Sequence, residues 1–201
     1  MRYVYRTLAS SVLILTSVAA IAEDHANKKF DGFYTGLEIG VSSDNFISLL
    51  RQPPNRETSL YYGGLLGFRK QIEGGWVFGI EGTFGDTGFS NTGDFPSPVP
   101  IDGIDFDGIS QTTRYEWSAG ITVGKVFGAD HSNLFFAKAA HVRTGREFID
   151  INRFISSGIR FGLGYEKAIS KSLSLRITSE FTDQVGTATS WAAKSGLIFK
   201  F

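Results

Sequence analysis

Apolar and polar residues alternate along most of this chain. In GFYTGLEIGVS, residues 32–42, most alternate positions from Phe33 to Val41 are apolar, and glycine or polar residues occupy most of the positions between them. The same pattern recurs in residues 157–166 and 173–181, and helical periodicity is almost absent. A period of two residues is typical of β-strands. We therefore predict eight strands, at about residues 32–42, 59–70, 76–85, 112–126, 134–143, 156–166, 173–182 and 190–201.

The connections between these segments alternate in length. Most of the segments are close to the ~9–11 residues that a tilted strand needs to cross a bilayer. The short connections are 71–75, 127–133 and 167–172, and the longer ones are 43–58, 86–111, 144–155 and 183–189. Three short turns at one end and four longer loops at the other predict an all-β fold, an eight-stranded antiparallel up-and-down β-barrel.

The polar face of the strands indicates which side of the barrel is inside. A soluble barrel buries its apolar face, whereas a membrane barrel turns that face toward lipid. Here the polar face is rich in glycine, serine and threonine and has charges of both signs, which suits the narrow interior of eight strands. A solvated sheet would have more lysine and less glycine. We predict a lumenal charge network of Glu38, Arg69, Glu81, Arg114, Glu116, Lys138, Arg160, Arg176, Glu180 and Lys194, with Lys138 included only in the favoured register of 134–143.

Large aromatic residues on the apolar face gather at two levels along the predicted barrel axis. If the chain starts at the short-turn end, one group lies near that rim and another near the opposite rim, with aliphatic residues such as Leu37 and Leu163 between them. Two aromatic belts around an aliphatic band match a bilayer, and a soluble core has no reason for such sorting. The predicted girdles of this transmembrane barrel are Phe33, Phe68, Trp76 and Tyr165 at the short-turn rim, and Tyr62, Phe84, Trp117, Phe181 and Trp191 at the other.

The N-terminal residues have the pattern of an export signal. Residues 1–22 contain Arg2 and Arg6, a short apolar run and a small residue at each side of Ile21, which predicts a secretory signal peptide cleaved after Ala22. We expect 23–31 to be a short periplasmic segment and 32–201 to be the barrel. The chain has 20 basic and 20 acidic residues, so no basic excess indicates nucleic acid as a partner. It has no cysteine, which excludes disulfides and thiolate metal sites.

Motifs for catalysis or cofactor binding are weak. GITVGKV, residues 120–126, has the wrong glycine spacing for a phosphate loop, and the acidic DGIDFDG at 102–108 lacks the spacing of an EF-hand. His141 faces lipid in the favoured register. Lipid A deacylases of the PagL type use an outward-facing histidine, serine and acid, for which Ser156 or Ser157 and Glu147 are the nearest candidates, although no local motif supports this. We expect no enzymatic activity, no cofactor and no metal.

Several segments resemble the OmpA/opacity-type eight-stranded outer-membrane barrels. The resemblance rests on GFYTGLEIG, FGIEGTF, GIRFGLGYEKAISKSLSLRITSEF and the aromatic terminus, and it extends over nearly all of residues 30–201. In that family a C-terminal phenylalanine, with apolar residues at alternating positions before it, is recognised by the barrel-assembly machinery. Leu197, Phe199 and Phe201 match that insertion signal. The resemblance implies the bacterial outer membrane as the location, with lipids and lipopolysaccharide as surroundings.

The sequence thus predicts an integral outer-membrane protein of a Gram-negative bacterium. Its expected role is structural and surface-interacting, through envelope integrity and through binding or adhesion by loops 43–58, 86–111 and 144–155 to a host or surface ligand. Three alternatives stay open at this point: a narrow pore, a barrel enzyme that modifies lipid A, and a soluble lipocalin-like binder.

Overall fold

Antiparallel strands make up most of the chain that the computed structural model describes. The described residues are 28–46, 56–87, 90–92, 110–148, 152–184 and 188–201. In chain order the elements are β1 (Gly32–Phe46), β2 (Arg56–Gln71), the 3-10 helix η2 (Glu73–Gly75), β3 (Trp76–Asp86), β4 (Ser90–Thr92), β5 (Ser110–Phe127), β6 (Asn133–Phe148), β7 (Asn152–Ala168), β8 (Leu173–Gln184) and β9 (Ala188–Lys200). In the part of the chain described, no helix has the length and apolar character needed to cross a membrane.

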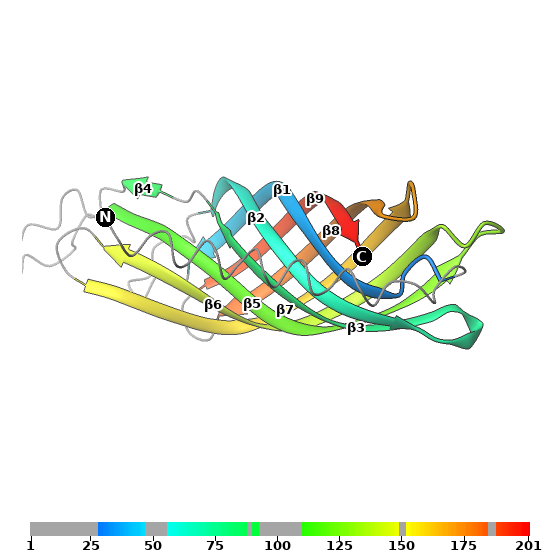
Figure 1. The fold of residues 1–201 in the computed structure, drawn as a ribbon. Helices are drawn as coiled ribbons and strands as arrows, with labels where there is room; N and C mark the ends of the chain where they lie inside the picture. The colour runs from blue at the N-terminus through cyan, green and yellow to red at the C-terminus, as the bar shows by residue number, and fades with distance from the viewer. Residues whose placement is uncertain (1–27, 47–55, 88–89, 93–109, 149–151, 185–187) are drawn as a thin grey trace, which may run out of the picture.

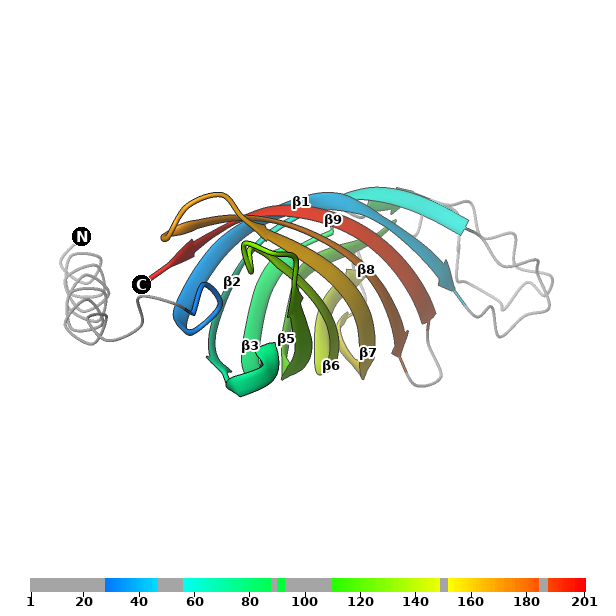
Figure 2. The same cartoon turned by 90° about the vertical axis from the view of Figure 1, so that its right-hand side faces the viewer.

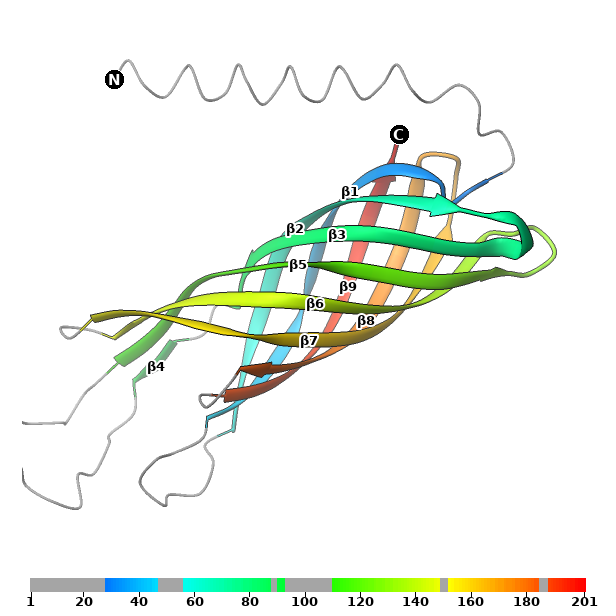
Figure 3. The ribbon, with the colours of Figure 1, turned by 90° about the horizontal axis from the view of Figure 1, so that it is seen from below.

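The long strands form a closed ring. They follow the order β3-β2-β1-β9-β8-β7-β6-β5, each antiparallel to its neighbours, and β3 pairs with β5 to close the ring. Figure 1 shows the strands tilted around one barrel, and in Figure 2 β9 runs beside β1. The short β4 pairs with the first residues of β5, beyond the end of β3 (Figure 3). The eight predicted strands and the eight-stranded antiparallel up-and-down barrel are confirmed.

The short connections lie at one end of the barrel, called the short-turn end. They comprise residues 72–75, 128–132 and 169–172, close to the predicted turns. In the first of them, Gly74 and Gly75 have φ values of 75° and 77°. Only glycine adopts this left-handed conformation without steric cost, which explains why the chain reverses at this glycine pair.

The predicted lengths of the longer connections are wrong. At the opposite, long-loop end, β6 continues to Phe148 and β7 begins at Asn152, so most of the expected loop 144–155 is strand. The expected loops 43–58 and 183–189 likewise contain the ends of strands, and 86–111 contains β4. These extensions are rich in polar and charged residues. Beyond the girdle a strand needs no apolar outer face, so the alternation fades while the backbone ladder continues.

Side chains alternate between the lumen and the outer surface along every long strand. Aliphatic residues at the middle of the outer face are strongly exposed, with Leu37 at 67% and Leu66 at 69% of their full surface. In β6, Lys138 is buried and His141 is exposed, which is the register that the sequence favoured. The barrel is therefore apolar outside and polar inside, the reverse of a soluble protein.

Candidate functional site

The charged side chains of the strands meet inside the barrel. Nine of the ten residues predicted for the network are buried: Glu38, Arg69, Glu81, Glu116, Lys138, Arg160, Arg176, Glu180 and Lys194. The tenth, Arg114, lies at a register shift between Thr113 and Tyr115 in the pairing of β5 with β6. The side chain of Arg114 lies outside the described residues.

In the half of the lumen nearer the short turns, two arginines share one carboxylate. Arg69 of β2 donates to both oxygens of Glu166 of β7, at 2.8 and 2.9 Å. Arg176 of β8 donates to Glu166 at 3.0 Å and to Glu81 of β3 at 2.5 Å. The hydroxyl of Tyr34 donates a further bond to Glu81, at 2.9 Å. Bidentate, charge-assisted bonds are the strong ones, so this cluster ties five strands together.

Glu180 of β8 is the centre of the other half of the network. Its carboxylate lies 2.7 Å from the ammonium of Lys194 and 3.5 Å from the guanidinium of Arg160, and it also pairs with Lys138. Arg160 makes a second ion pair, at 2.6 Å, with Glu116 of β5. Three cations around one carboxylate make Glu180 the most highly connected acid of the network.

Glu38 is buried near this cluster without joining it. Among the described residues it makes no ion pair, and its Oε2 atom accepts no hydrogen bond. The ammonium of Lys194, a nearby cation, pairs with Glu180 and lies 3.7 Å from the centre of the Tyr61 ring. Glu38 is therefore inside the lumen, as expected, but contributes less to the cross-links than the other acids.

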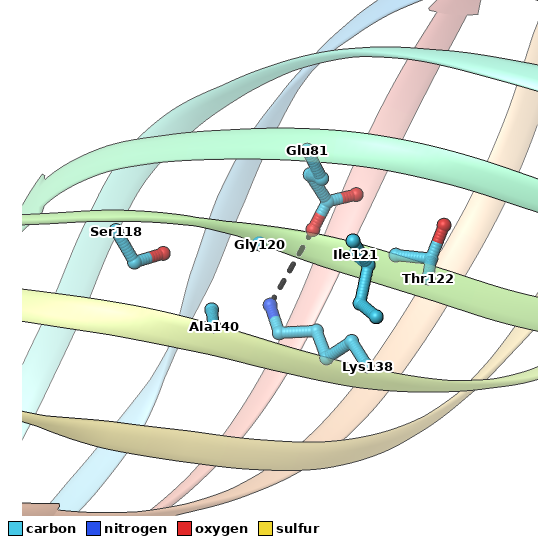
Figure 4. Close-up of a pocket in the computed structure, with 7 residues that line it drawn as sticks. All are labelled: Glu81, Ser118, Gly120, Ile121, Thr122, Lys138 and Ala140. Atoms are coloured by element: carbon cyan, nitrogen blue, oxygen red, sulfur yellow. Dashed lines mark hydrogen bonds and ion pairs between the residues drawn. The ribbon is translucent and has the colours of Figure 1, made fainter.

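Packing between these side chains is close. Lys138 and Glu81 form an ion pair at 3.4 Å across the view in Figure 4, and the space around them is too small for a water molecule. A Cβ atom at Gly162 would lie 3.1 Å from Cγ of Lys138 and 3.2 Å from Cγ of Glu180. Glycine at this inward position leaves room for the charged side chains to reach across the lumen.

Glu166 is the charged residue that the predicted network omits. It is fully buried and binds both Arg69 and Arg176. The alternation in the predicted strand 156–166 places Glu166 on the same polar face as Arg160, and this was the signal that could have identified it. With Glu166, the described charges of the network balance: Glu38, Glu81, Glu116, Glu166 and Glu180 against Arg69, Lys138, Arg160, Arg176 and Lys194.

Residues 28–31, here called the N-terminal cork, close the short-turn end of the lumen. Phe30 is fully buried, and the N–H of Phe30 donates to the side chain of Gln71. The carboxylate of Asp31 accepts the backbone N–H of Gln71 at 2.9 Å, and Lys200 donates to the carbonyl of Lys29 at 3.1 Å. The inward-facing residues that share the apolar cluster with Phe30 are Val77, Val126, Leu134, Phe136 and Ala168.

The lumen toward the long loops contains many neutral polar groups together with two buried acids, Glu116 and Asp44. The hydroxyls of Thr83 and Ser118 are 2.7 Å apart. Ser156 donates to the side chain of Gln184, which in turn donates to Thr144 at 2.8 Å. The lumen is thus apolar at the short turns and rich in ion pairs in the middle, and toward the long loops hydroxyl and amide groups lie among the remaining charges.

Of the residues considered as a catalytic group with His141, one serine lies inside the barrel and the other outside. The imidazole lies 6.3 Å from the Trp117 ring in an edge-on arrangement. Ser156 points into the lumen and bonds Gln184, while Ser157 is exposed and pairs with Arg143 across the strands. The side chain of Glu147 lies outside the described residues. Among the residues that the structure describes, no group of histidine, aspartate or glutamate is arranged to hold a metal ion.

Aromatic residues pair on the outer surface near both ends. Phe33 and Phe68 are 4.8 Å apart at the short-turn rim, and Phe181 and Trp191 are 4.9 Å apart near the other rim. All nine predicted girdle residues lie outward with exposed or partly exposed side chains: Phe33, Tyr62, Phe68, Trp76, Phe84, Trp117, Tyr165, Phe181 and Trp191.

The last strand places the three residues of the predicted insertion signal on the outer surface. Leu197 and Phe199 face outward from β9, at 44% exposure each. Phe201 follows β9, and its N–H donates to the carbonyl of Phe33 at 3.0 Å. The C-terminal residue is therefore held against the first strand while its ring stays exposed.

The closed strands, polar lumen and apolar exterior define an eight-stranded β-barrel with the surface of a membrane protein. Solved structures share this fold. Neisserial surface protein A is similar with a TM-score of 0.53 and 14% identity, over 85% of this chain and 98% of that one. Ail of Yersinia pestis, in complex with the heparin analogue sucrose octasulfate, has a TM-score of 0.48 and 14% identity, over 84% and 99%. OprG from Pseudomonas aeruginosa has a TM-score of 0.48 and 11% identity, over 85% and 96%.

The similarity lies in structure rather than in sequence. No protein-family model matches the chain, and no curated protein matches it. At 14% identity, the similarity to Neisserial surface protein A supports the barrel fold alone.

Proposed function

We propose that this protein is an integral outer-membrane β-barrel that reinforces the envelope and presents its long-loop end to partners outside the cell. The distribution of side chains supports this most directly: a balanced set of charges is buried in the lumen, and an aliphatic band between two aromatic girdles is exposed. In water, such a surface would aggregate. In a bilayer, it meets lipid tails in the middle and headgroups at the aromatic rings.

The packed lumen favours a closed barrel over the alternatives. A lipocalin-like binder needs an apolar cavity, whereas here ion pairs fill the middle of the barrel and Phe30 closes one end. A narrow pore needs a continuous water path, which the cross-lumen pairs and the cork obstruct. A lipid A enzyme needs an outward catalytic group, and of the two candidate serines Ser156 lies inside while only Ser157 is exposed. The proposed role therefore involves neither transport nor catalysis.

The long-loop end supports the surface-interacting part of the proposal. Trp117 of β5 pairs with Arg143 of β6, and both strands continue past this pair, to Ser110 and Phe148. The ends of β5, β6 and β7 project at the left side of Figure 3. The adjoining segment 86–111 contains five aspartates and no basic residue. The extended strands and the acidic composition of this connection suit a cationic host or surface ligand, with lipopolysaccharide as the immediate surroundings.

Fractionation of cells that express the full chain tests the proposal. We expect the protein in the outer-membrane fraction, extracted only by detergent, with a gel mobility that changes on heating because a folded barrel resists denaturation. Planar bilayers should then show no large, stable conductance. Recovery of folded protein from the aqueous periplasm would contradict the membrane location, and steady channels from the unmutated protein would contradict the closed lumen.

A further inference from the structure

The lysines of this chain are distributed unevenly along the barrel axis. The sequence has nine lysines. Lys138 and Lys194 lie in the lumen, and the other seven lie at the short-turn end or in the N-terminal cork: Lys28, Lys29, Lys70, Lys125, Lys167, Lys171 and Lys200. The acids at that end are fewer, and in the described chain they are Asp31, Glu73 and Asp130. The short-turn end therefore has a positive excess.

The opposite end has no lysine in its connections. The segments 47–55, 87–109, 149–151 and 185–187 contain one arginine and five aspartates. The charge of the chain is therefore distributed asymmetrically along the barrel axis, with a positive rim at one end and acidic connecting segments at the other. Because the network inside the barrel is balanced, that asymmetry comes from the two ends.

Four of the lysines form a collar on the outside of the short-turn rim. Lys70, Lys125 and Lys167 are each two residues from an outward-facing aromatic residue, respectively Phe68, Phe127 and Tyr165, and Lys171 lies in the turn between β7 and β8. A lysine beside an interfacial aromatic ring is at the level of lipid headgroups, where its stem lies on apolar surface and its ammonium reaches the polar zone. The lysine collar is here Lys70, Lys125, Lys167 and Lys171.

Two members of the lysine collar are already engaged with the protein. Lys70 pairs with Asp31 at 3.1 Å, and Lys125 donates to the carbonyl of Gly74 and lies 5.0 Å from the Trp76 ring centre. Lys167 and Lys171 make no hydrogen bond or ion pair with any described residue, and both are exposed. The uncompensated charge of the collar is therefore concentrated at the β7–β8 turn.

The β7–β8 turn is well ordered by its own hydrogen bonds. The N–H groups of Ile169 and Ser170 both donate to the carbonyl of Leu173, at 2.9 and 3.0 Å, and the hydroxyl of Ser170 accepts the N–H of Leu173. Ile169 is 53% exposed between the two lysines. An apolar side chain flanked by two free ammonium groups on a fixed turn suits a lipid, with acyl chain on one side and phosphate on the other.

We propose that the lysine collar binds the headgroups of anionic phospholipids in the leaflet at the short-turn end, with Lys167 and Lys171 as the principal contacts. This inference rests on the proposed membrane location. Each lysine near an anionic lipid surface adds about fivefold in affinity at low ionic strength. Salt weakens the effect because the contacts are exposed to solvent.

Lipid competition in a reconstituted bilayer tests the lysine collar. The refolded full chain is inserted into nanodiscs of phosphatidylcholine mixed with phosphatidylglycerol, and native mass spectrometry counts the lipids that stay bound. We expect phosphatidylglycerol to be retained preferentially, and the double variant Lys167→Gln with Lys171→Gln to lose at least fivefold of that preference. Lys70→Gln, which removes a rim lysine whose ammonium already pairs with Asp31, is the matched control and should reduce the preference clearly less.

The outcomes separate the two proposals. Failure to insert into pure phosphatidylcholine would contradict the membrane location itself. Insertion without a preference for phosphatidylglycerol, or an unchanged preference in the double variant, would overturn the lysine collar alone. If the double variant does not refold, added sodium chloride gives the same test on the unmutated protein: a preference that persists at high salt would also overturn the collar. Binding of a soluble anionic cell-wall polymer in place of lipid would overturn it too.

Discussion

The buried acids of the lumen differ in how many cations they hold. Glu180 pairs with Lys138, Arg160 and Lys194, whereas Glu38 makes no ion pair among the described residues. Removing one partner from a buried ion pair is costly because the remaining charge stays buried without compensation. The position of an acid in the network should therefore decide its contribution to stability, although both acids lie on the same inward face.

Glu180→Gln should lower the free energy of unfolding by ~3–5 kcal/mol, since three cations lose their shared carboxylate. Glu38→Gln is the matched control, with the same chemistry at a buried acid, and should cost clearly less. Urea titration of both variants, refolded in lipid vesicles, measures the difference. Equal losses for the two variants would contradict the contacts assigned to Glu180.

The substitution Leu163→Arg tests whether the outer surface of the barrel faces lipid. Leu163 is 55% exposed in the aliphatic band of β7, so arginine there would place a charge at the level of lipid tails. The expected cost is ~2–4 kcal/mol in vesicles. The same titration measures it, with Leu163→Ile as a control of similar volume. A neutral or stabilising effect of the arginine would show that this face meets water.

At the scale of elements, the N-terminal cork is the part of the barrel that the sequence did not predict. The sequence predicted residues 23–31 only as a short periplasmic segment between the signal peptide and the first strand. The structure places Phe30 inside the apolar cluster and uses the flanking polar groups to bind the rim. A single aromatic residue forms no periodic pattern that would predict its burial. The site that buries Phe30 exists only after the strands have closed into a barrel.

Phe30→Ala should destabilise the barrel by ~3–5 kcal/mol, the usual cost of removing a fully buried phenylalanine. It should also speed the exchange of amide hydrogens in the short-turn half of the lumen, because water gains access there. Phe33→Ala, two strand positions beyond the cork and facing outward, is the control and should leave exchange in the lumen unchanged. Hydrogen exchange followed by mass spectrometry checks both variants, and slow exchange in Phe30→Ala would show that residues 28–31 do not seal the lumen.

The end of β9 leads to a prediction about assembly rather than stability. Phe201 is exposed and contributes one backbone hydrogen bond, to Phe33. Deleting Phe201 should therefore change the urea midpoint of the refolded barrel little, while the yield of outer-membrane protein in cells falls strongly. The test compares the urea midpoint and the outer-membrane yield of the truncated chain with those of the full chain. A normal yield in cells would show that the barrel-assembly machinery does not need this residue.

At the scale of the whole molecule, alternation predicted the ring of strands and the facing of its side chains, because a barrel wall imposes a period of two over its full height. The lumenal charges and both girdles followed from that period. The features that the alternation did not predict depend on contacts between strands that are far apart in the sequence. The pairing of Glu166 of β7 with Arg69 of β2 is one of them. The strands β6 and β7 continue beyond the apolar segments from which their limits were predicted. The pairing of Glu180 with three cations required the diameter and register of the closed barrel.

Two of the ion pairs inside the barrel connect opposite walls. β2, which carries Arg69, and β7, which carries Glu166, are four places apart around the ring of eight, and so are β3 with Glu81 and β8 with Arg176. These pairs act as struts across the diameter of a tube. An empty tube flattens easily under sideways load, because bending its wall costs little. In this tube any flattening must stretch or crush a strut, so its cross-section should stay round when the surrounding membrane is compressed or stretched.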